Sequence, residues 1–278
     1  MLHDQPRNIF KSGSKTYFYS SLFFPPKIRD EVSTLYAFVR TADNFVDSVP
    51  QDQAGFYAFR QKFMAAWQGN GPVGDPVIDR FLELAKKNKF QLEWVQAFLE
   101  SMEMDLHKTQ YKNLAELENY IFGSAEVVGL MMARILGLPE EADRCARLQG
   151  KAMQFINFLR DINEDLKLGR VYFPQDELRF NGVESLEYTW VSKNQEIFNK
   201  FTLHQIARYR QWQEQAAEGY KYIPRTYLPP IKTAAEMYNW TAEQIKRDPM
   251  EVFRKTVKPS KLRIIMTVLR HKMENCFI

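Results

Sequence analysis

The sequence predicts an all-α fold in a single domain, and three observations support this. Apolar residues recur at intervals of three and four along almost the whole chain, and we find no convincing run with the alternation of a strand. With 278 residues, 45% of them hydrophobic, the chain can bury a sizeable core. The breaks between helical segments are too short to be interdomain linkers. We therefore expect one domain over residues 1–278.

Proline and turn residues set the order of the expected helices. Pro25 and Pro26 open one helix, because proline suits a first turn, and Pro50 ends it. Further helices are expected over about 54–68, 76–88, 91–108, 113–137, 140–167, 187–223, 228–247 and 258–275. The main breaks are expected at 69–76, 167–183 and 224–230.

The stretch GNGPVG at 69–74 matches the dinucleotide-binding pattern G-x-G-x-x-G. That kind of site needs a strand before the glycines and a helix N-terminus after them. Here a helical segment, FRQKFMAAWQ, precedes the glycines and prolines interrupt the stretch. We therefore interpret it as a surface turn.

Composition limits the classes of partner and the compartment. The formal charge of +4 and the pI near 8.8 suit anionic small molecules or a membrane surface, and the charge is too diffuse to indicate nucleic acid. Two cysteines without paired spacing indicate a reducing compartment. The N-terminus lacks the apolar core of a signal peptide, and the most apolar segment, 127–138, is shorter than the roughly 20 residues that span a bilayer. We expect a cytoplasmic monomer, soluble or peripherally bound to a membrane.

The stretch RTADNFVD places Asp43 and Asp47 four residues apart on a helix rich in aromatic residues. Two carboxylates at that spacing repel each other by roughly 0.2–0.5 kcal/mol. At helical period Tyr36 and Arg40 fall on the same stripe. A single such pair is most often a solvated helix face.

A second acidic pair lies about 120 residues later, in MQFINFLRDINEDLKLGRVYFP (153–174). Asp161 and Asp165 are again four apart, and Gln154 and Asn157 continue the same polar stripe. If both stripes face one cavity, the four carboxylates need a divalent cation to neutralise them. Oxygen ligands without His or Cys suit Mg²⁺, with Mn²⁺ as an alternative, and Mg²⁺ commonly bridges carboxylates to substrate phosphates.

Basic residues stand beside each pair, where they could hold phosphates: Arg40, Arg160, Lys167 and Arg170. The two stripes therefore predict a diphosphate–magnesium site. A di-iron bundle is the obvious alternative for carboxylates among helices, but it needs Glu-x-x-His pairs. No histidine of the chain has an acidic residue three positions before it, and that alternative fails.

These residues also resemble the aspartate-rich motifs of the squalene/phytoene synthase family. RTADNFVD matches the first motif, with Asn44 where many members have an aspartate, and NFLRDINED followed by GRVYFP matches the second. Three other stretches agree in order along the chain: SGSKTYFYSSLFFP (12–25), LYAFVR (35–40) and FGSAEVVG (122–129). The stretch PQDELRFNGV resembles the phytoene synthases of the family, although relatives that make C30 products have a similar sequence here. The basic C-terminal region matches poorly.

The resemblance implies the all-α isoprenoid synthase fold, with helices around a central hydrophobic cavity. It implies Mg²⁺-dependent head-to-head (1′–1) condensation of two allylic prenyl diphosphates through a cyclopropyl diphosphate. Two geranylgeranyl diphosphates would give phytoene; the alternative is a squalene, dehydrosqualene or presqualene diphosphate synthase that uses farnesyl diphosphate. No NADPH motif is recognisable, which weakly favours ending the reaction by proton loss.

The resemblance also implies the roles of individual residues. Mg²⁺ and the diphosphates would be held by Asp43, Asp47, Asn157, Asp161 and Asp165. Diphosphate or the reacting cation would be contacted by Ser14, Lys15, Tyr17, Tyr36, Arg40, Gln154, Arg160 and Tyr172. The aromatic faces that could cradle a carbocation are Tyr17, Phe18, Tyr36, Phe155, Phe158 and Tyr172, although aromatics at helical spacing are more often core.

Several alternatives stay open at this point. A head-to-tail prenyl elongation enzyme or a terpene cyclase uses related motifs, and the GRVYFP context argues against both. A non-catalytic helical assembly factor would be expected to have lost its carboxylates. Gly123 and Gly129 inside a helix indicate either close helix packing or room for an isoprenoid tail. The basic residues at 254–270 could line the diphosphate end, touch anionic lipid that receives the product, or form a solvated face.

Overall fold

The computed structural model describes residues 5–69 and 71–276, and it confirms the all-α fold class. Helices make up 76% of the structure, and the described residues contain no strand. A single isolated bridge joins Gln110 to Val171. No described helix has both the length and the apolar character that a bilayer span requires.

The N-terminal part of the chain forms eight α-helices and one π-helical segment, named in chain order. They are α1 (Gln5–Gly13), α2 (Lys15–Ser21), α3 (Pro26–Asp47), α4 (Gln53–Trp67), α5 (Pro76–Lys87), α6 (Leu92–His107), α7 (Leu114–Ile121), the π-helical η1 (Phe122–Glu126) and α8 (Val127–Ile135).

The C-terminal part continues with a 3₁₀ turn and further helices. They are η2 (Glu140–Ala142), α9 (Asp143–Arg160), α10 (Ile162–Lys167), α11 (Gln175–Phe180), α12 (Tyr188–Val191), α13 (Gln195–Ala217), the 3₁₀ segment η3 (Glu218–Tyr222), α14 (Leu228–Arg247), α15 (Glu251–Arg254) and α16 (Lys261–Cys276).

Local capping explains several helix starts. The Asp75 carboxylate accepts hydrogen bonds from the N–H groups of Val77 and Ile78 at the start of α5. The Asn113 side chain caps α7 in the same way. Pro26 opens α3, as the sequence predicts. Residues 69 and 71–74, between α4 and α5, are mostly exposed, and no strand lies on either side in the described residues, so the surface-turn interpretation is confirmed.

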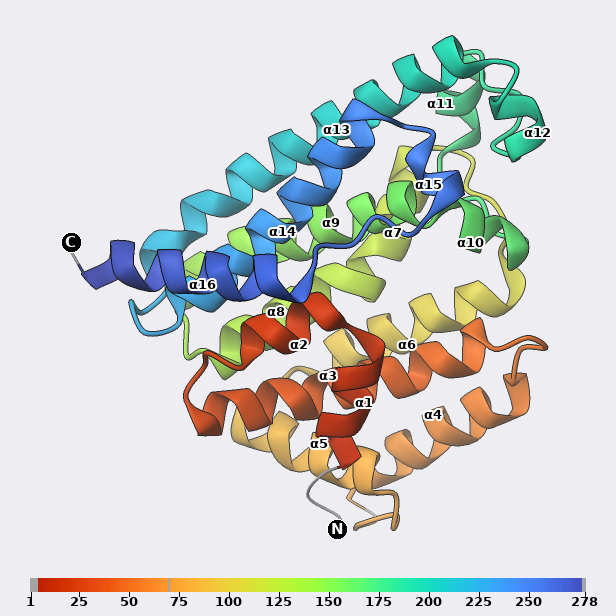
Figure 1. Ribbon diagram of the computed structural model, residues 1–278. Coiled ribbons are helices and arrows are strands. Elements are labelled where there is room, and N and C mark those ends of the chain that lie inside the picture. Colours follow the sequence, from red (N-terminus) through yellow and green to blue (C-terminus); the bar gives the residue numbers. More distant parts are fainter. Residues whose placement is uncertain (1–4, 70, 277–278) are drawn as a thin grey trace.

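Two apolar clusters lie on either side of a cavity. One is built around α3–α6 and α8, where the Phe38 and Phe81 rings stack with centroids 3.8 Å apart. The other is built around α9, α13 and α14. In Figure 1, α13 and α14 lie beside α9 in the upper half of the molecule, while α3, α4 and α5 form the lower half. The two clusters therefore supply opposite walls of the space between them.

The structure differs from the sequence prediction at several places. The helix expected over 187–223 is interrupted at 192–194, between α12 and α13, and the break expected at 167–183 contains α11. Helices α1 and α2 were not predicted, because both are short and only Ser14 separates them. The helix expected over 140–167 breaks at Asp161, whose ψ of 13° separates α9 from α10. The helix expected over 113–137 contains the π-helical segment at its centre.

Candidate active site

The two acidic pairs converge, although they lie far apart in the sequence. Asp43 and Asp47 occupy the last turns of α3, and Asp161 and Asp165 flank the α9–α10 break. Arg170 connects the two regions: its Nη1 lies 2.8 Å from Asp47 Oδ1, and its backbone N–H donates to the carbonyl oxygen of Asp165 at 2.9 Å. The prediction that both motifs face one site is consistent with this geometry.

Arg170 has a different position from the one the sequence predicts. We expected it to face phosphate, but its side chain is 4% exposed and is occupied by protein groups. Nη2 donates to the carbonyl oxygen of Val46 at 2.6 Å, in addition to the bond to Asp47. Lys167 is exposed. Arg170 therefore serves as an internal counter-charge for the acidic cluster.

Asp105 is a buried carboxylate that the sequence analysis missed. Its two oxygens accept hydrogen bonds from the hydroxyls of Tyr172, at 2.8 Å, and Tyr120, at 2.7 Å. Arg170 Nε lies 3.8 Å from Asp105 Oδ1. One signal could have found this residue: Asp105 stands at the core-facing position of α6, seven residues after Phe98 and three after Met102. Tyr172 is placed in this network and stacks on Phe158, with ring centroids 4.3 Å apart.

The acids raise one another's pKa values. Burial and the neighbouring charge of Asp47 raise the pKa of Asp43 to about 7. Burial and the charge of Asp161 raise the pKa of Asp165 well above its usual range, and the charges of Asp105 and Asp47 act in the same direction. The effect of Asp47 on Asp165 shows that the two motifs lie within electrostatic reach of each other.

In each acidic motif, one aspartate forms an ion pair with an arginine. Arg160 donates from Nε to Asp161 Oδ1 at 2.7 Å, and its Nη2 bonds to the other oxygen of the same carboxylate. Arg40 pairs with Asp43 one turn along α3. These guanidinium groups lie at the acidic cluster, where an anionic ligand would meet them.

The donor set fits a hard divalent cation. Among residues 5–69 and 71–276, no three Asp, Glu, His or Cys side chains form a ready-made metal cluster. Asn157 Oδ1, one turn before Asp161, is nevertheless a buried acceptor without a hydrogen-bond partner. Such an orphaned oxygen carries a free-energy cost that a cation would remove. Carboxylate and amide oxygens are the ligands that Mg²⁺ prefers.

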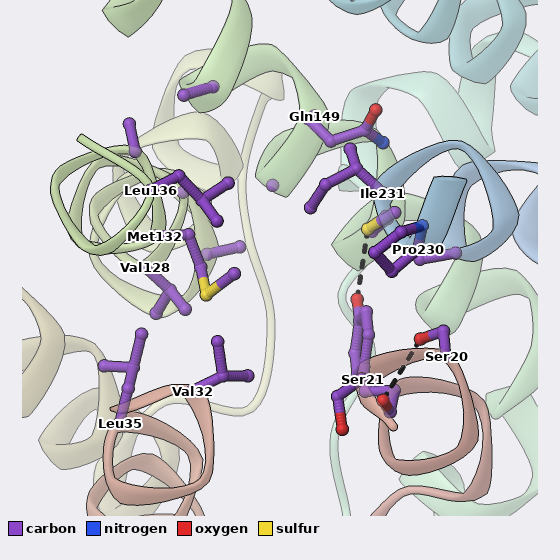
Figure 2. Close-up of a pocket in the computed structure, with 18 of the residues that line it drawn as sticks. Ser20, Ser21, Val32, Leu35, Val128, Met132, Leu136, Gln149, Pro230 and Ile231 are labelled. Atoms are coloured by element: carbon purple, nitrogen blue, oxygen red, sulfur yellow. Dashed lines mark hydrogen bonds between the residues drawn. The ribbon is translucent and has the colours of Figure 1, made fainter. Parts of the chain in front are cut away.

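An apolar cavity of about 300 Å³ reaches Asn157, one turn before Asp161 on α9. Its lining does not include the four aspartates of the two motifs, Arg40, Arg160 or Tyr172. Figure 2 shows three side chains that face Pro230 and Ile231 of α14 across open space. They are Val128 and Met132 of α8 and Leu136 at the C-terminal end of that helix. The cavity follows α9 from Asn157 to Cys145, a distance of roughly 18 Å at 1.5 Å per residue. Its polar end carries Tyr36, Gln154 and Asn157, while most of the remaining lining is apolar. The cavity therefore suits a long hydrocarbon with a polar head.

The structure brings some predicted site residues to this cavity and leaves others away from it. Tyr17, Tyr36, Gln154 and Asn157 line the cavity. Ser14 caps α2, accepting a hydrogen bond from the Tyr17 N–H at 3.3 Å, and is not part of the lining. The side chain of Lys15 lies outside the described residues.

Aromatic residues at the cavity differ in part from those predicted. The hydroxyl of Tyr17 donates to Met153 Sδ at 3.1 Å, and Tyr36 stacks on Phe10 with centroids 4.4 Å apart. Phe155 is fully buried against Trp212 and is core. Phe18 and Phe158 are also buried away from the lining, and the lining aromatics that were not predicted are Phe10, Phe24 and Tyr220.

Close helix packing explains the glycines of FGSAEVVG. A Cβ on Gly123 would lie 2.1 Å from the carbonyl oxygen of Ala97, and one on Gly129 would lie 2.2 Å from that of Ala146. The same stretch contains the π-helical segment, and Gly129 also lines the cavity. Close packing is therefore confirmed for both glycines, and room for an isoprenoid tail stays a prediction.

Comparison with known proteins agrees with this geometry. The family model described as "Squalene/phytoene synthase" matches residues 10–263. The chain is 33% identical over 177 residues to a 15-cis-phytoene synthase of Paracoccus, covering 60% of this chain and 58% of that protein. It is 27% identical over 279 residues to a chloroplastic phytoene synthase of an Oncidium hybrid, covering 96% of this chain and 66% of that protein. The chain thus spans less than two thirds of the length of these relatives.

Solved structures show the same fold at lower identity. A dehydrosqualene synthase crystallised with a ligand superposes with a TM-score of 0.82 at 21% identity, over 100% of this chain and 97% of that one. A squalene synthase of Alicyclobacillus acidocaldarius gives a TM-score of 0.78 at 22% identity, over 88% of this chain and 93% of that one.

Proposed function

The chain belongs to the squalene/phytoene synthase family, and on that premise we propose that it joins two allylic prenyl diphosphates head to head (1′–1) through a cyclopropyl diphosphate. One observation carries the proposal: one end of an apolar cavity of about 300 Å³ is lined by Tyr36 of α3 and by Gln154 and Asn157 of α9, the two helices whose C-terminal ends carry the acidic motifs. A diphosphate head at the charged end and an isoprenoid tail in the cavity match this division of polarity.

Mg²⁺ is the cation that the donor set fits. Asp43, Asp47, Asp161, Asp165 and Asn157 would hold it, and when bound it would supply positive charge to the departing diphosphate. Arg40 and Arg160 would bind the same diphosphate with planar, bidentate donors. Their present carboxylate partners are the groups a cation would engage, so binding the metal would release guanidinium donors for the substrate.

The cavity walls would protect the allylic cation that forms when diphosphate leaves. Val128, Met132 and Ile231 keep water from the reacting carbons because they offer no hydrogen-bonding group. The rings of Tyr17 and Tyr36, at the polar end of the cavity, would stabilise positive charge through their π faces. Gln154 on α9 would orient the head group beside them.

Geranylgeranyl diphosphate is the substrate we propose, with phytoene as the product. The curated relatives named above are phytoene synthases, and the cavity runs for roughly 18 Å along α9. A farnesyl-using synthase that makes a C30 product is the alternative within the same reaction class.

The test is a product assay on the purified protein. Farnesyl or geranylgeranyl diphosphate is incubated with Mg²⁺, with and without NADPH, and the hydrocarbon and released pyrophosphate are measured. We expect a symmetric C40 hydrocarbon from geranylgeranyl diphosphate without NADPH. A longer diphosphate, a cyclised terpene, or the absence of Mg²⁺-dependent pyrophosphate release from both substrates would contradict the proposal.

A further inference from the structure

Helix α16 has one buried face and one apolar face open to solvent. Its buried face, which includes Ile264 and Val268, packs on α14 and α2. On the opposite side, the exposed fractions are 69% for Leu262, 58% for Met266, 43% for Leu269 and 60% for Met273. These four side chains, the α16 stripe, fall within roughly 60° around the helix axis at 3.6 residues per turn. A continuous exposed apolar stripe of this kind is typical of a binding surface.

Cationic side chains flank the α16 stripe on both sides. Arg263 and Arg270 lie on one rim, and Lys261 and Lys272 lie on the other, at about 70–110° from the middle of the stripe by helical period. Glu274 is the only acidic residue of the helix. It lies on the Arg263–Arg270 side, and Arg270 pairs with it and with Glu236 of α14.

Aromatic rings hold three of the cations near the surface of the fold. Lys261 Nζ lies 5.2 Å from the centroid of Tyr19, and Lys272 Nζ lies 5.1 Å from that of Phe23. The guanidinium carbon of Arg263 lies 5.1 Å from the Trp240 ring. The positive charges are thus kept at the edges of the stripe, and the apolar side chains lie between them.

The α16 stripe lies behind one wall of the cavity. Helix α16, dark blue in Figure 1, crosses α14 and the red helix α2. Tyr17 and Ser20 of α2 and Ile231 and Ala234 of α14 line the cavity on their other side. A surface that covers the α16 stripe therefore lies two helix layers from the cavity.

We propose that α16 docks this chain on an anionic lipid surface, with the α16 stripe inserted among the acyl chains. An in-plane helix with an apolar face and basic flanks is suited to the boundary between headgroups and acyl chains. The cations of both rims would then meet lipid phosphates. A second copy of the chain fits less well, because antiparallel or parallel pairing of two stripes brings cationic rims together. Most of α16 lies beyond residues 10–263, which the family model matches.

The test is co-sedimentation of the full chain with vesicles of phosphatidylcholine alone or phosphatidylcholine with phosphatidylglycerol. We expect binding to the anionic vesicles, weaker binding to the neutral ones, and weakening by salt. Met266→Glu/Met273→Glu should lower binding to anionic vesicles about tenfold or more. Lys261→Gln/Lys272→Gln should lower it about fivefold for each charge removed. No diphosphate is present, so the result is independent of the proposed reaction.

Phe180→Glu is the matched control, because Phe180 is 85% exposed on α11, away from α16. It should leave vesicle binding unchanged. Circular dichroism and thermal unfolding establish that each variant is folded, and light scattering after size exclusion gives the oligomeric state. Absence of binding to anionic vesicles, equal binding by the Met266→Glu/Met273→Glu variant, or a dimer that this variant dissociates would each overturn the proposal.

Discussion

Arg170 and Asp47 form an ion pair between segments 123 residues apart, with Nη1 and Oδ1 separated by 2.8 Å. Nη2 of the same guanidinium donates to the Val46 carbonyl oxygen, and its Nε lies 3.8 Å from Asp105 Oδ1. The second acidic motif is thus fastened to the end of α3 by a residue of the loop that follows α10. This contact joins the end of α3 to the segment that follows α10.

Arg170→Met should destabilise the fold strongly. It leaves the buried charge of Asp105 and the partly exposed charge of Asp47 without their counter-ion, and loss of the partner of a buried charge typically costs about 3–5 kcal/mol. Arg170→Lys keeps the positive charge, but an ammonium group lacks the planar guanidinium that donates to both Asp47 and the Val46 carbonyl. We therefore expect an intermediate loss in the free energy of unfolding. Urea unfolding measures both. Arg254→Met is the control, because its ion pair with Asp248 is largely exposed and should contribute less than about 1 kcal/mol. Equal effects at Arg170 and Arg254 would contradict this role.

Asp43→Asn and Asp161→Asn should each remove turnover while leaving helical content near that of the unmodified protein. Each change removes a charged ligand from the proposed cation site and leaves side-chain shape intact. We expect activity below about one hundredth of the original. Pyrophosphate release measures the loss, and circular dichroism measures the fold. Near-normal turnover in both variants would refute the proposed site.

Helical periodicity was sufficient to predict the fold class and most long helices, because one face of each is continuously apolar. Helices α1 and α2 escaped prediction because seven to nine residues give too few turns for a periodic signal. The break at Asp161 was also missed. The chain resumes helical hydrogen bonding immediately, with the Asp165 N–H donating to the Asp161 carbonyl at 2.8 Å, so the periodicity hardly changes.

The candidate site was predictable only in part. The spacing of the aspartates shows which of them share a helix face, but no local pattern shows which partner each finds. Arg170 was expected to bind ligand and instead pairs with Asp47. Asp105 was missed because a single carboxylate in the apolar stripe of α6 has meaning only when Tyr120 and Tyr172, distant in sequence, are seen to meet it.

Val128→Phe should discriminate against the longer substrate. Val128 faces Ile231 and Pro230 across the open cavity in Figure 2, so the larger ring enters empty space and not packed core. For each hydrocarbon group of the tail that no longer fits, kcat/KM should fall about tenfold or more. We expect a larger fall with geranylgeranyl than with farnesyl diphosphate, and little change in melting temperature. An equal fall with both substrates would indicate that the tail does not occupy this region.

Gly123→Ala should destabilise the protein by about 1–3 kcal/mol, because the added methyl overlaps the Ala97 carbonyl oxygen and the Ser101 hydroxyl. In an open helix the same change would stabilise by roughly 1 kcal/mol. Ser124→Ala in the same π-helical segment is the control. The Ser124 hydroxyl is buried without a hydrogen-bond partner, so its removal should cost little. Thermal unfolding measures the stability of both variants. Stabilisation by Gly123→Ala would show that the packing around Gly123 is loose.

Asp105 should make stability depend on pH. Burial raises its pKa to about 6 from 3.8, although the Arg170 charge and the hydroxyls of Tyr120 and Tyr172 act in the opposite direction. Between about pH 4 and pH 6 the folded state therefore binds a proton that the unfolded state has released, so the stability contributed by Asp105 falls as pH rises and is level above about pH 6. Asp105→Asn removes this dependence.

The measurement is the free energy of unfolding in urea for both proteins from pH 4 to pH 7.5. The value for the unmodified protein minus that for Asp105→Asn should fall by on the order of 2–3 kcal/mol across the window. Tyr120→Phe sharpens the test, because it deletes a donor that holds the pKa of Asp105 down, and the decline should then extend to higher pH. A difference that stays flat, or that rises with pH, would mean that Asp105 is ionised in the folded protein throughout.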